Sequence, residues 1–66
     1  MRIRNFPPGS LVAKINWDNE VIDQGIVIQQ DPRHPLVDTQ VLFTSGTRWE
    51  AAHDLVHIHE LPIRPH

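Results

Sequence analysis

The stretch Val41-Leu42-Phe43-Thr44-Ser45-Gly46-Thr47-Arg48-Trp49 contains two apolar runs separated by Ser45-Gly46. This pattern is typical of a β-hairpin, because glycine takes the positive φ that a tight turn between two strands demands. We therefore predict a hairpin with strands at about 38–44 and 47–51, joined through Ser45-Gly46. The rest of the chain is expected to form strands that pack around this hairpin.

Upstream of the hairpin, two further segments have strand character. Residues 24–30 are rich in β-branched side chains, and Gly25 is expected to mark a bulge or a close approach of two backbones. In the segment 11–17, the residues Leu11, Ala13, Ile15 and Trp17 alternate with Val12, Lys14 and Asn16. This period of two predicts a strand with one apolar face. The acidic segment 18–23 and the proline-containing segment 31–35 are expected to be loops.

Downstream of the hairpin, residues 51–55 are too few for a stable α-helix and predict one turn of 3₁₀ helix, with Leu55 in the core. A last strand is expected at 56–59. The prolines near both ends interrupt regular structure. We therefore expect an N-terminal extended arm at 1–9, a single β domain at 10–60 and a C-terminal tail at 61–66.

The composition limits the possible functions. The chain has 66 residues, no cysteine and a formal net charge of −2. A chain of this length forms one small domain with a small core, and without cysteine it has neither a disulfide nor a thiolate metal site. No apolar run is long enough for a signal peptide or a membrane span. The negative charge disfavours nonspecific binding to nucleic acid.

The order of the predicted elements resembles a known group of proteins. The residues that carry this resemblance are Pro8-Gly9-Ser10-Leu11-Val12, Gly25-Ile26-Val27, Val41-Leu42-Phe43 with Ser45-Gly46, Trp49, and Asp54-Leu55-Val56. Together they look like the small SH3-like barrel proteins encoded by tailed bacteriophages. The resemblance implies an all-β, five-stranded SH3-like barrel with one 3₁₀ turn before the last strand. It also implies a location in the host cytoplasm or the virion, and it supplies no catalytic residue and no cofactor.

Histidines near the C-terminus suggest one candidate site. His57 and His59 have the spacing that places two side chains on one face of a strand, where two imidazoles can share a metal ion. Asp54 or Glu60 is a candidate for the third ligand. The alternative is that this face simply carries polar side chains into solvent, because a metal site also needs a third ligand and supporting hydrogen bonds.

Aromatic and apolar residues suggest partner-binding sites. Trp17 and Trp49, together with Phe43, are candidates for a binding platform, because aromatic side chains dominate many interfaces. The alternative is that the two indoles close the ends of a small core. The apolar residues of the terminal segments are candidates for docking on neighbouring molecules: Ile3, Phe6, Leu61 and Ile63.

No spacing of serine, histidine or carboxylate residues matches a nucleophile elbow, a phosphate-binding loop or a metal hydrolase. We therefore expect a non-catalytic module that binds other proteins or copies of itself, in a virion or another multi-copy assembly. Recognition of proline-rich peptides is disfavoured, because the chain has no tyrosine. The alternative function is a nucleic-acid-associated or host-regulatory barrel that acts on transcription or translation through Lys14, Arg33 and Arg48.

Overall fold

The computed structural model describes residues 5–34 and 36–61. These residues form one antiparallel sheet of five strands in the order β4-β3-β2-β1-β5, which confirms the all-β prediction. The strands are β1 (Leu11–Ile15), β2 (Val21–Gln30), β3 (Thr39–Phe43), β4 (Gly46–Glu50) and β5 (Leu55–His57). Two 3₁₀ turns complete the fold, η1 (Ala52–Asp54) and η2 (Ile58–Glu60).

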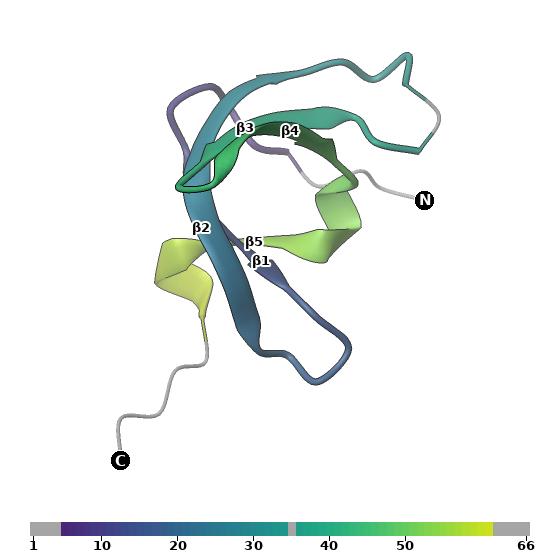
Figure 1. Ribbon diagram of the computed structural model, residues 1–66. Coiled ribbons are helices and arrows are strands. Elements are labelled where there is room, and N and C mark those ends of the chain that lie inside the picture. Colours follow the sequence, from purple (N-terminus) through teal and green to yellow (C-terminus); the bar gives the residue numbers. More distant parts are fainter. Residues whose placement is uncertain (1–4, 35, 62–66) are drawn as a thin grey trace.

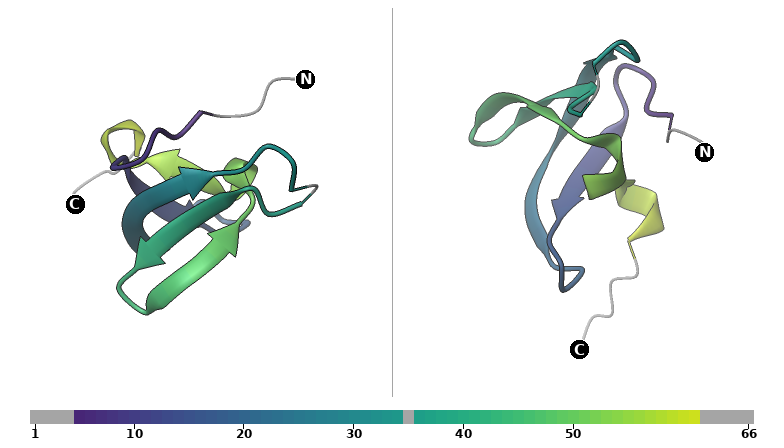
Figure 2. Two further views of the ribbon diagram at one scale, coloured as in Figure 1. Left: turned by 90° about the horizontal axis from the view of Figure 1, so that it is seen from above. Right: turned by 90° about the vertical axis from the view of Figure 1, so that its right-hand side faces the viewer.

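The long strand β2 is the centre of the sheet. It pairs with β1 on one side and with β3 on the other. Figures 1 and 2 show β2 curving from the β3–β4 hairpin to the β1–β5 pair. The sheet is not closed in the part of the chain that the structure describes, because β4 pairs with β3 alone and β5 with β1 alone.

Gly25 lies where β2 and β3 approach each other most closely. A Cβ atom at this position would overlap the carbonyl oxygen of Leu42 and would lie 2.7 Å from Cγ1 of Val41. No side chain fits in this space, so the glycine is required by the contact between the two backbones. The predicted close approach at Gly25 is confirmed.

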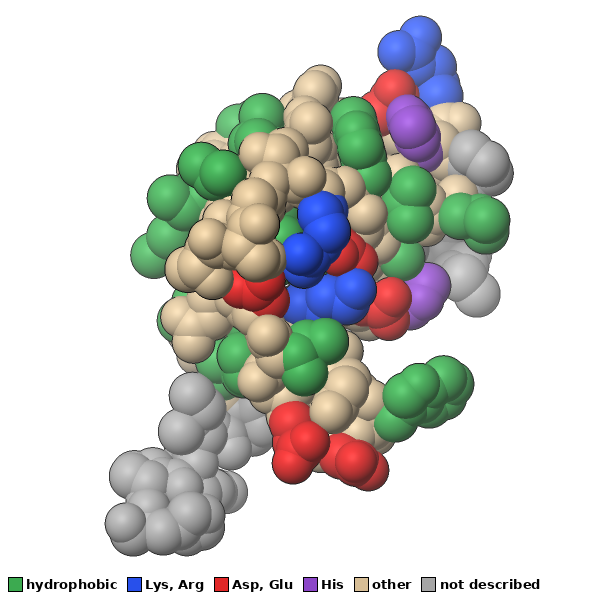
Figure 3. Space-filling view, in the orientation of Figure 1, with side chains coloured by type: hydrophobic (Ala, Val, Ile, Leu, Met, Phe, Trp, Pro, Cys, Tyr) green, Lys and Arg blue, Asp and Glu red, His purple; other side chains and the backbone are tan. Residues whose placement is uncertain are grey.

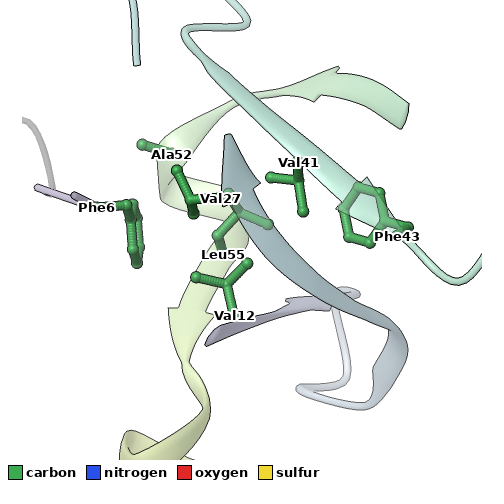
Figure 4. Packing of buried hydrophobic residues seen from close by; sticks show 7 residues of the cluster. All are labelled: Phe6, Val12, Val27, Val41, Phe43, Ala52 and Leu55. Atoms are coloured by element: carbon green, nitrogen blue, oxygen red, sulfur yellow. The ribbon is translucent and has the colours of Figure 1, made fainter. Parts of the chain in front are cut away.

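The core lies on the concave side of the bent sheet (Figure 4). Its members are Phe6, Val12, Val27, Val41, Phe43, Ala52 and Leu55. Leu55 is completely buried, as the sequence predicts. The predicted 3₁₀ turn before the last strand is also confirmed, because η1 occupies Ala52–Asp54 and brings Ala52 into the core.

Phe6 lies in the core and does not match the prediction that it docks on a neighbouring molecule. Its side chain has no exposed surface, so the prediction that it contacts a partner is wrong. The backbone N–H of Phe6 donates to Oε1 of Gln30 (2.9 Å), and the Phe6 ring lies 4.6 Å from the His57 ring. Burial of a side chain of this size stabilises the fold by about 1.5–3 kcal/mol, which is a large share of the stability of a small domain.

The prediction of a single inward face for β1 is wrong in part: Ala13, from the predicted apolar face, is completely buried, but so is Val12 from the opposite face. Val12 is completely buried, whereas Leu11 is 57% exposed. Val12 pairs with Gly25 on β2 and with His57 on β5, and its side chain belongs to the core on the concave side of the sheet. Trp17 is not on the strand, because β1 ends at Ile15. Both sides of β1 carry apolar residues, and alternation alone therefore cannot identify the core side.

Several boundaries differ from the expectation. β2 begins at Val21, within the segment 18–23 that was expected to be a loop. The hairpin turn consists of Thr44 and Ser45, because Gly46 already pairs with Phe43 as the first residue of β4. Gly46 retains the positive φ (129°) that the sequence suggested. The last strand ends at His57, and the next three residues form η2, so His59 is not on the strand.

We expect Gly25→Ala to destabilise the protein by about 3 kcal/mol, because the added methyl group meets a backbone carbonyl that cannot move without breaking the β2–β3 pairing. Urea denaturation followed by circular dichroism measures this change. Gln24→Ala, at the exposed neighbouring position, is the control and is expected to change the stability by less than about 0.5 kcal/mol. Equal stability of the two variants would contradict the close approach.

Candidate functional site

A groove of about 520 Å³ lies between the β1–β2 loop and η1. Its lining residues are Lys14, Ile15, Asn16, Trp17, Ile22, His53 and Asp54. Trp17 is fully exposed at 101% and is the largest apolar side chain at this groove. We refer to these seven residues as the Trp17 groove. A fully exposed indole beside a concave surface is a typical anchor for a binding partner.

The β1–β2 loop is held in shape by Asn16. Its Oδ1 accepts hydrogen bonds from the backbone N–H groups of Asp18 and Glu20, both at 2.9 Å, and its Nδ2 donates to Oε1 of Glu20 (3.0 Å). Asn19 takes a left-handed conformation (φ 61°), which asparagine tolerates better than most residues. Trp17 therefore projects from an ordered turn, so that binding requires little further ordering of the loop.

The charges at the groove favour a cationic partner. Nζ of Lys14 lies 2.6 Å from Oε1 of the buried Glu50, so its charge is compensated within the protein. Asp54 contributes a carboxylate to the lining, with His53 Nε2 3.6 Å from its Oδ1. The exposed carboxylates of Asp18 and Glu20 are on the adjoining loop. The uncompensated charge around Trp17 is therefore negative.

An ionic cluster connects β1, β2 and β4 next to the open side of the sheet. Glu50 accepts from Lys14 through Oε1 (2.6 Å) and from Nε of Arg48 through Oε2 (3.1 Å). A second nitrogen of Arg48 lies 3.4 Å from Oδ2 of Asp23, and its guanidinium carbon lies 4.4 Å from the centre of the Phe43 ring. Figure 3 shows basic and acidic side chains side by side in the middle of this face.

Hydrogen bonds keep the pKa of Asp23 low. The Ser45 hydroxyl donates to Oδ2 (2.7 Å), and the Thr44 hydroxyl (2.9 Å) and the Gln24 backbone N–H (2.8 Å) donate to Oδ1. The Ser45 bond is the largest cause of a decrease in the pKa from 3.8 to about 2, and partial burial opposes it. Asp23 thereby fixes the hairpin turn to the start of β2.

The structure does not assemble the predicted aromatic platform. Trp17 is at the groove, whereas Phe43 is buried beneath the Arg48 guanidinium. Trp49 is half-buried, and its ring stacks on His34 with a centroid distance of 4.6 Å and an angle of 9°. Of the two predicted tryptophans, Trp17 alone has a fully exposed ring.

His57 and His59 do lie close together, with ring centroids 5.1 Å apart. The His57 side chain accepts a hydrogen bond from the backbone N–H of Glu60, and the Glu60 carboxylate accepts from the His57 N–H (3.2 Å). His57 and Glu60 thus form a capping box at the N-terminal end of η2. Residues 5–34 and 36–61 contain no group of three or more His, Cys, Asp or Glu side chains that could hold a metal ion.

The remaining residues that were predicted to bind a partner or a nucleic acid form no further site in the described part of the chain. Leu61 is half-buried, and its backbone N–H bonds to the carbonyl of Ile58 (3.1 Å). Ile3 and Ile63 lie outside the described residues. The basic residues of the alternative function are paired with carboxylates: Lys14 and Arg48 with Glu50, and Arg33 with Asp31 (3.0 Å).

Sequence reasoning missed the Asn16 turn and the ionic cluster. Asn16 follows directly after the alternating segment and precedes Asp18-Asn19, which is a recognisable turn signal. The cluster has no local signal, because Asp23 and Arg48 are far apart in the chain and meet only through the sheet.

Comparison of the chain with protein-family models, with curated proteins and with solved structures finds no match. No helix within the described part of the chain is long and apolar enough to cross a membrane.

We expect Asp23→Asn to lower the stability at neutral pH and to flatten its dependence on pH between about 4 and 2. The folded-state pKa is below the ordinary value of 3.8, so the contribution of Asp23 is fully present above that value and is lost as the pH falls towards 2. Thermal melts as a function of pH measure this effect. Asp18→Asn, at an exposed position on the β1–β2 loop, is the matched control. An unchanged pH profile in Asp23→Asn would contradict the role of the cluster.

Proposed function

We propose that this protein is a non-catalytic protein-binding module and that the Trp17 groove is its binding surface. The observation that carries the proposal is the fully exposed Trp17, held by an ordered turn beside a groove. Removal of an exposed indole from water on binding supplies a large apolar contact at a small cost in side-chain entropy.

The partner is a protein segment that carries apolar and basic side chains next to each other. The apolar side chains contact Trp17, Ile15 and Ile22, while lysine or arginine meets the carboxylate of Asp54. An arginine or lysine also interacts favourably with the face of an indole. The carboxylates of the adjoining loop attract such a segment and disfavour acidic ones.

The finer fold assignment is part of this proposal. The strand order β4-β3-β2-β1-β5, a long β2 shared by two halves of the sheet and a 3₁₀ turn before β5 support an SH3-like barrel. Docking in a virion or another multi-copy assembly, with a contribution from the terminal segments, is supported by the sequence resemblance alone. The compensated charges of Lys14, Arg33 and Arg48 favour this reading over nucleic-acid binding.

The proposal is tested with short peptides that alternate leucine with arginine or leucine with glutamate. Trp49→Phe leaves Trp17 as the sole tryptophan, because the chain has two. We expect the leucine–arginine peptide to shift the Trp17 emission to shorter wavelength, with an affinity that falls as salt is added. The leucine–glutamate peptide is expected to leave the emission unchanged.

Calorimetry with the same peptides identifies the residues responsible. We expect Trp17→Ala to weaken binding of the leucine–arginine peptide by about tenfold or more, and Asp54→Asn to weaken it to a smaller extent. Trp49→Phe is the control and retains the wild-type affinity. Equal binding of both peptides, or an affinity that Trp17→Ala leaves unchanged, would rule out this function for the groove.

A further inference from the structure

The convex side of the sheet carries a row of exposed aliphatic side chains. Leu11 on β1 pairs with Ile26 on β2, and Ile26 pairs with Leu42 on β3. These three side chains are 57%, 46% and 50% exposed. Their neighbours Val12, Val27 and Val41 point to the opposite side and form the core. The sheet therefore has a second apolar face, with one residue from each of three adjacent strands.

Ile58 extends this row beyond the sheet. One hollow of about 360 Å³ is lined by Leu11, Gln24, Gly25, Ile26, Leu42, Phe43, Thr44 and Ile58. A second hollow of about 500 Å³ is lined by Pro7, Ser10, Leu11, His57, Ile58 and His59. Leu11 and Ile58 belong to both hollows, so they form a ridge between them. We refer to Leu11, Ile26, Leu42 and Ile58 as the aliphatic face.

Within residues 5–34 and 36–61, the aliphatic face carries no formal charge. None of the aspartate, glutamate, lysine and arginine residues in this part of the chain lines either hollow. Two copies of a chain with a net charge of −2 repel each other through their charged surfaces. At this face, they can approach without placing like charges opposite each other.

We propose that a second copy of this chain covers the aliphatic face. A two-fold axis places the same patch on both subunits, so the patch must be complementary to itself. A ridge flanked by hollows meets this requirement, because the ridge of each copy enters a hollow of the other. Two sheets packed in this way lie about 10 Å apart, with their aliphatic side chains interdigitated.

The size of the face sets the strength of the dimer. Stable complexes bury about 800 Å² on each partner. Four partly exposed aliphatic side chains provide the apolar centre of such an interface but less than its full area. The dimer is therefore weak and reversible, with a dissociation constant on the order of micromolar or higher. This inference does not rest on the proposed function, because the Trp17 groove shares no lining residue with either hollow.

Sedimentation equilibrium of the full chain, at concentrations up to about 1 mM, tests the proposal. We expect a monomer–dimer equilibrium whose dissociation constant rises by about tenfold or more in Leu42→Glu, because each subunit then buries a charge at the interface. Leu36→Glu is the matched control, since Leu36 is 78% exposed and lies outside both hollows. This control retains the wild-type equilibrium.

A milder variant, Ile26→Thr, distinguishes a weakened dimer from a Leu42→Glu protein that does not fold. Ile26→Thr removes apolar surface but retains a β-branched side chain suited to a strand, and it is expected to weaken the dimer while the circular dichroism spectrum stays unchanged. A wild-type chain that remains monomeric throughout the concentration range overturns the proposal. So does a dimer that Leu42→Glu and Ile26→Thr leave intact, or one that Trp17→Ala dissociates.

Discussion

The contact between the backbones of β2 and β3 at Gly25 is the constraint on which the rest of the structure depends. Because Gly25 has no side chain, the carbonyl group of Leu42 and the side chain of Val41 can occupy the space that a Cβ atom would need. Gly25 also pairs with Val12 on one side and Phe43 on the other, and both of these side chains are buried. The glycine thus allows three adjacent strands to meet over one core. The curvature of β2, which joins the two halves of the sheet, is consistent with this close packing.

The open side of the sheet is bridged by charges instead of backbone hydrogen bonds. Glu50 on β4 holds Lys14 from β1, and Arg48 holds Asp23 from β2, so side chains connect strands that do not pair with each other. Such bonds are individually worth little where they are exposed to solvent. They nevertheless determine position, because the buried carboxylate of Glu50 would be left without its two cations if Lys14 and Arg48 moved away. The same pairing leaves negative charge around the Trp17 groove.

Local sequence signals predicted the hairpin, the close approach at Gly25, the 3₁₀ turn and the burial of Leu55. Each of these features depends on neighbouring residues or on the special properties of glycine. Phe6 could not be placed in this way, because its burial depends on Gln30 and His57, which reach it only in the folded chain. The face of β1 was predicted only in part, for another reason: Leu11, Val12 and Ala13 are all apolar, and alternation cannot show that Val12 and Ala13 are both buried while Leu11 is exposed. Trp17 was predicted as part of an aromatic platform with Trp49 and Phe43, whereas its own full exposure depends on the Asn16 turn.

The two proposed binding surfaces have different chemistry. The Trp17 groove combines an indole with the carboxylate of Asp54, so the proposed binding there would depend on the charge of the partner. The hollows of the aliphatic face are lined by uncharged side chains, so the proposed contact there would depend on shape. A dimer formed through the aliphatic face would carry two Trp17 grooves. If such a dimer met a partner with two basic segments, the second groove would bind intramolecularly. The avidity could then exceed the affinity of one groove by about 10²–10⁴ when the spacing allows both contacts. Under the two proposals, a small domain with weak individual interfaces would acquire a preference for repetitive, multi-copy partners.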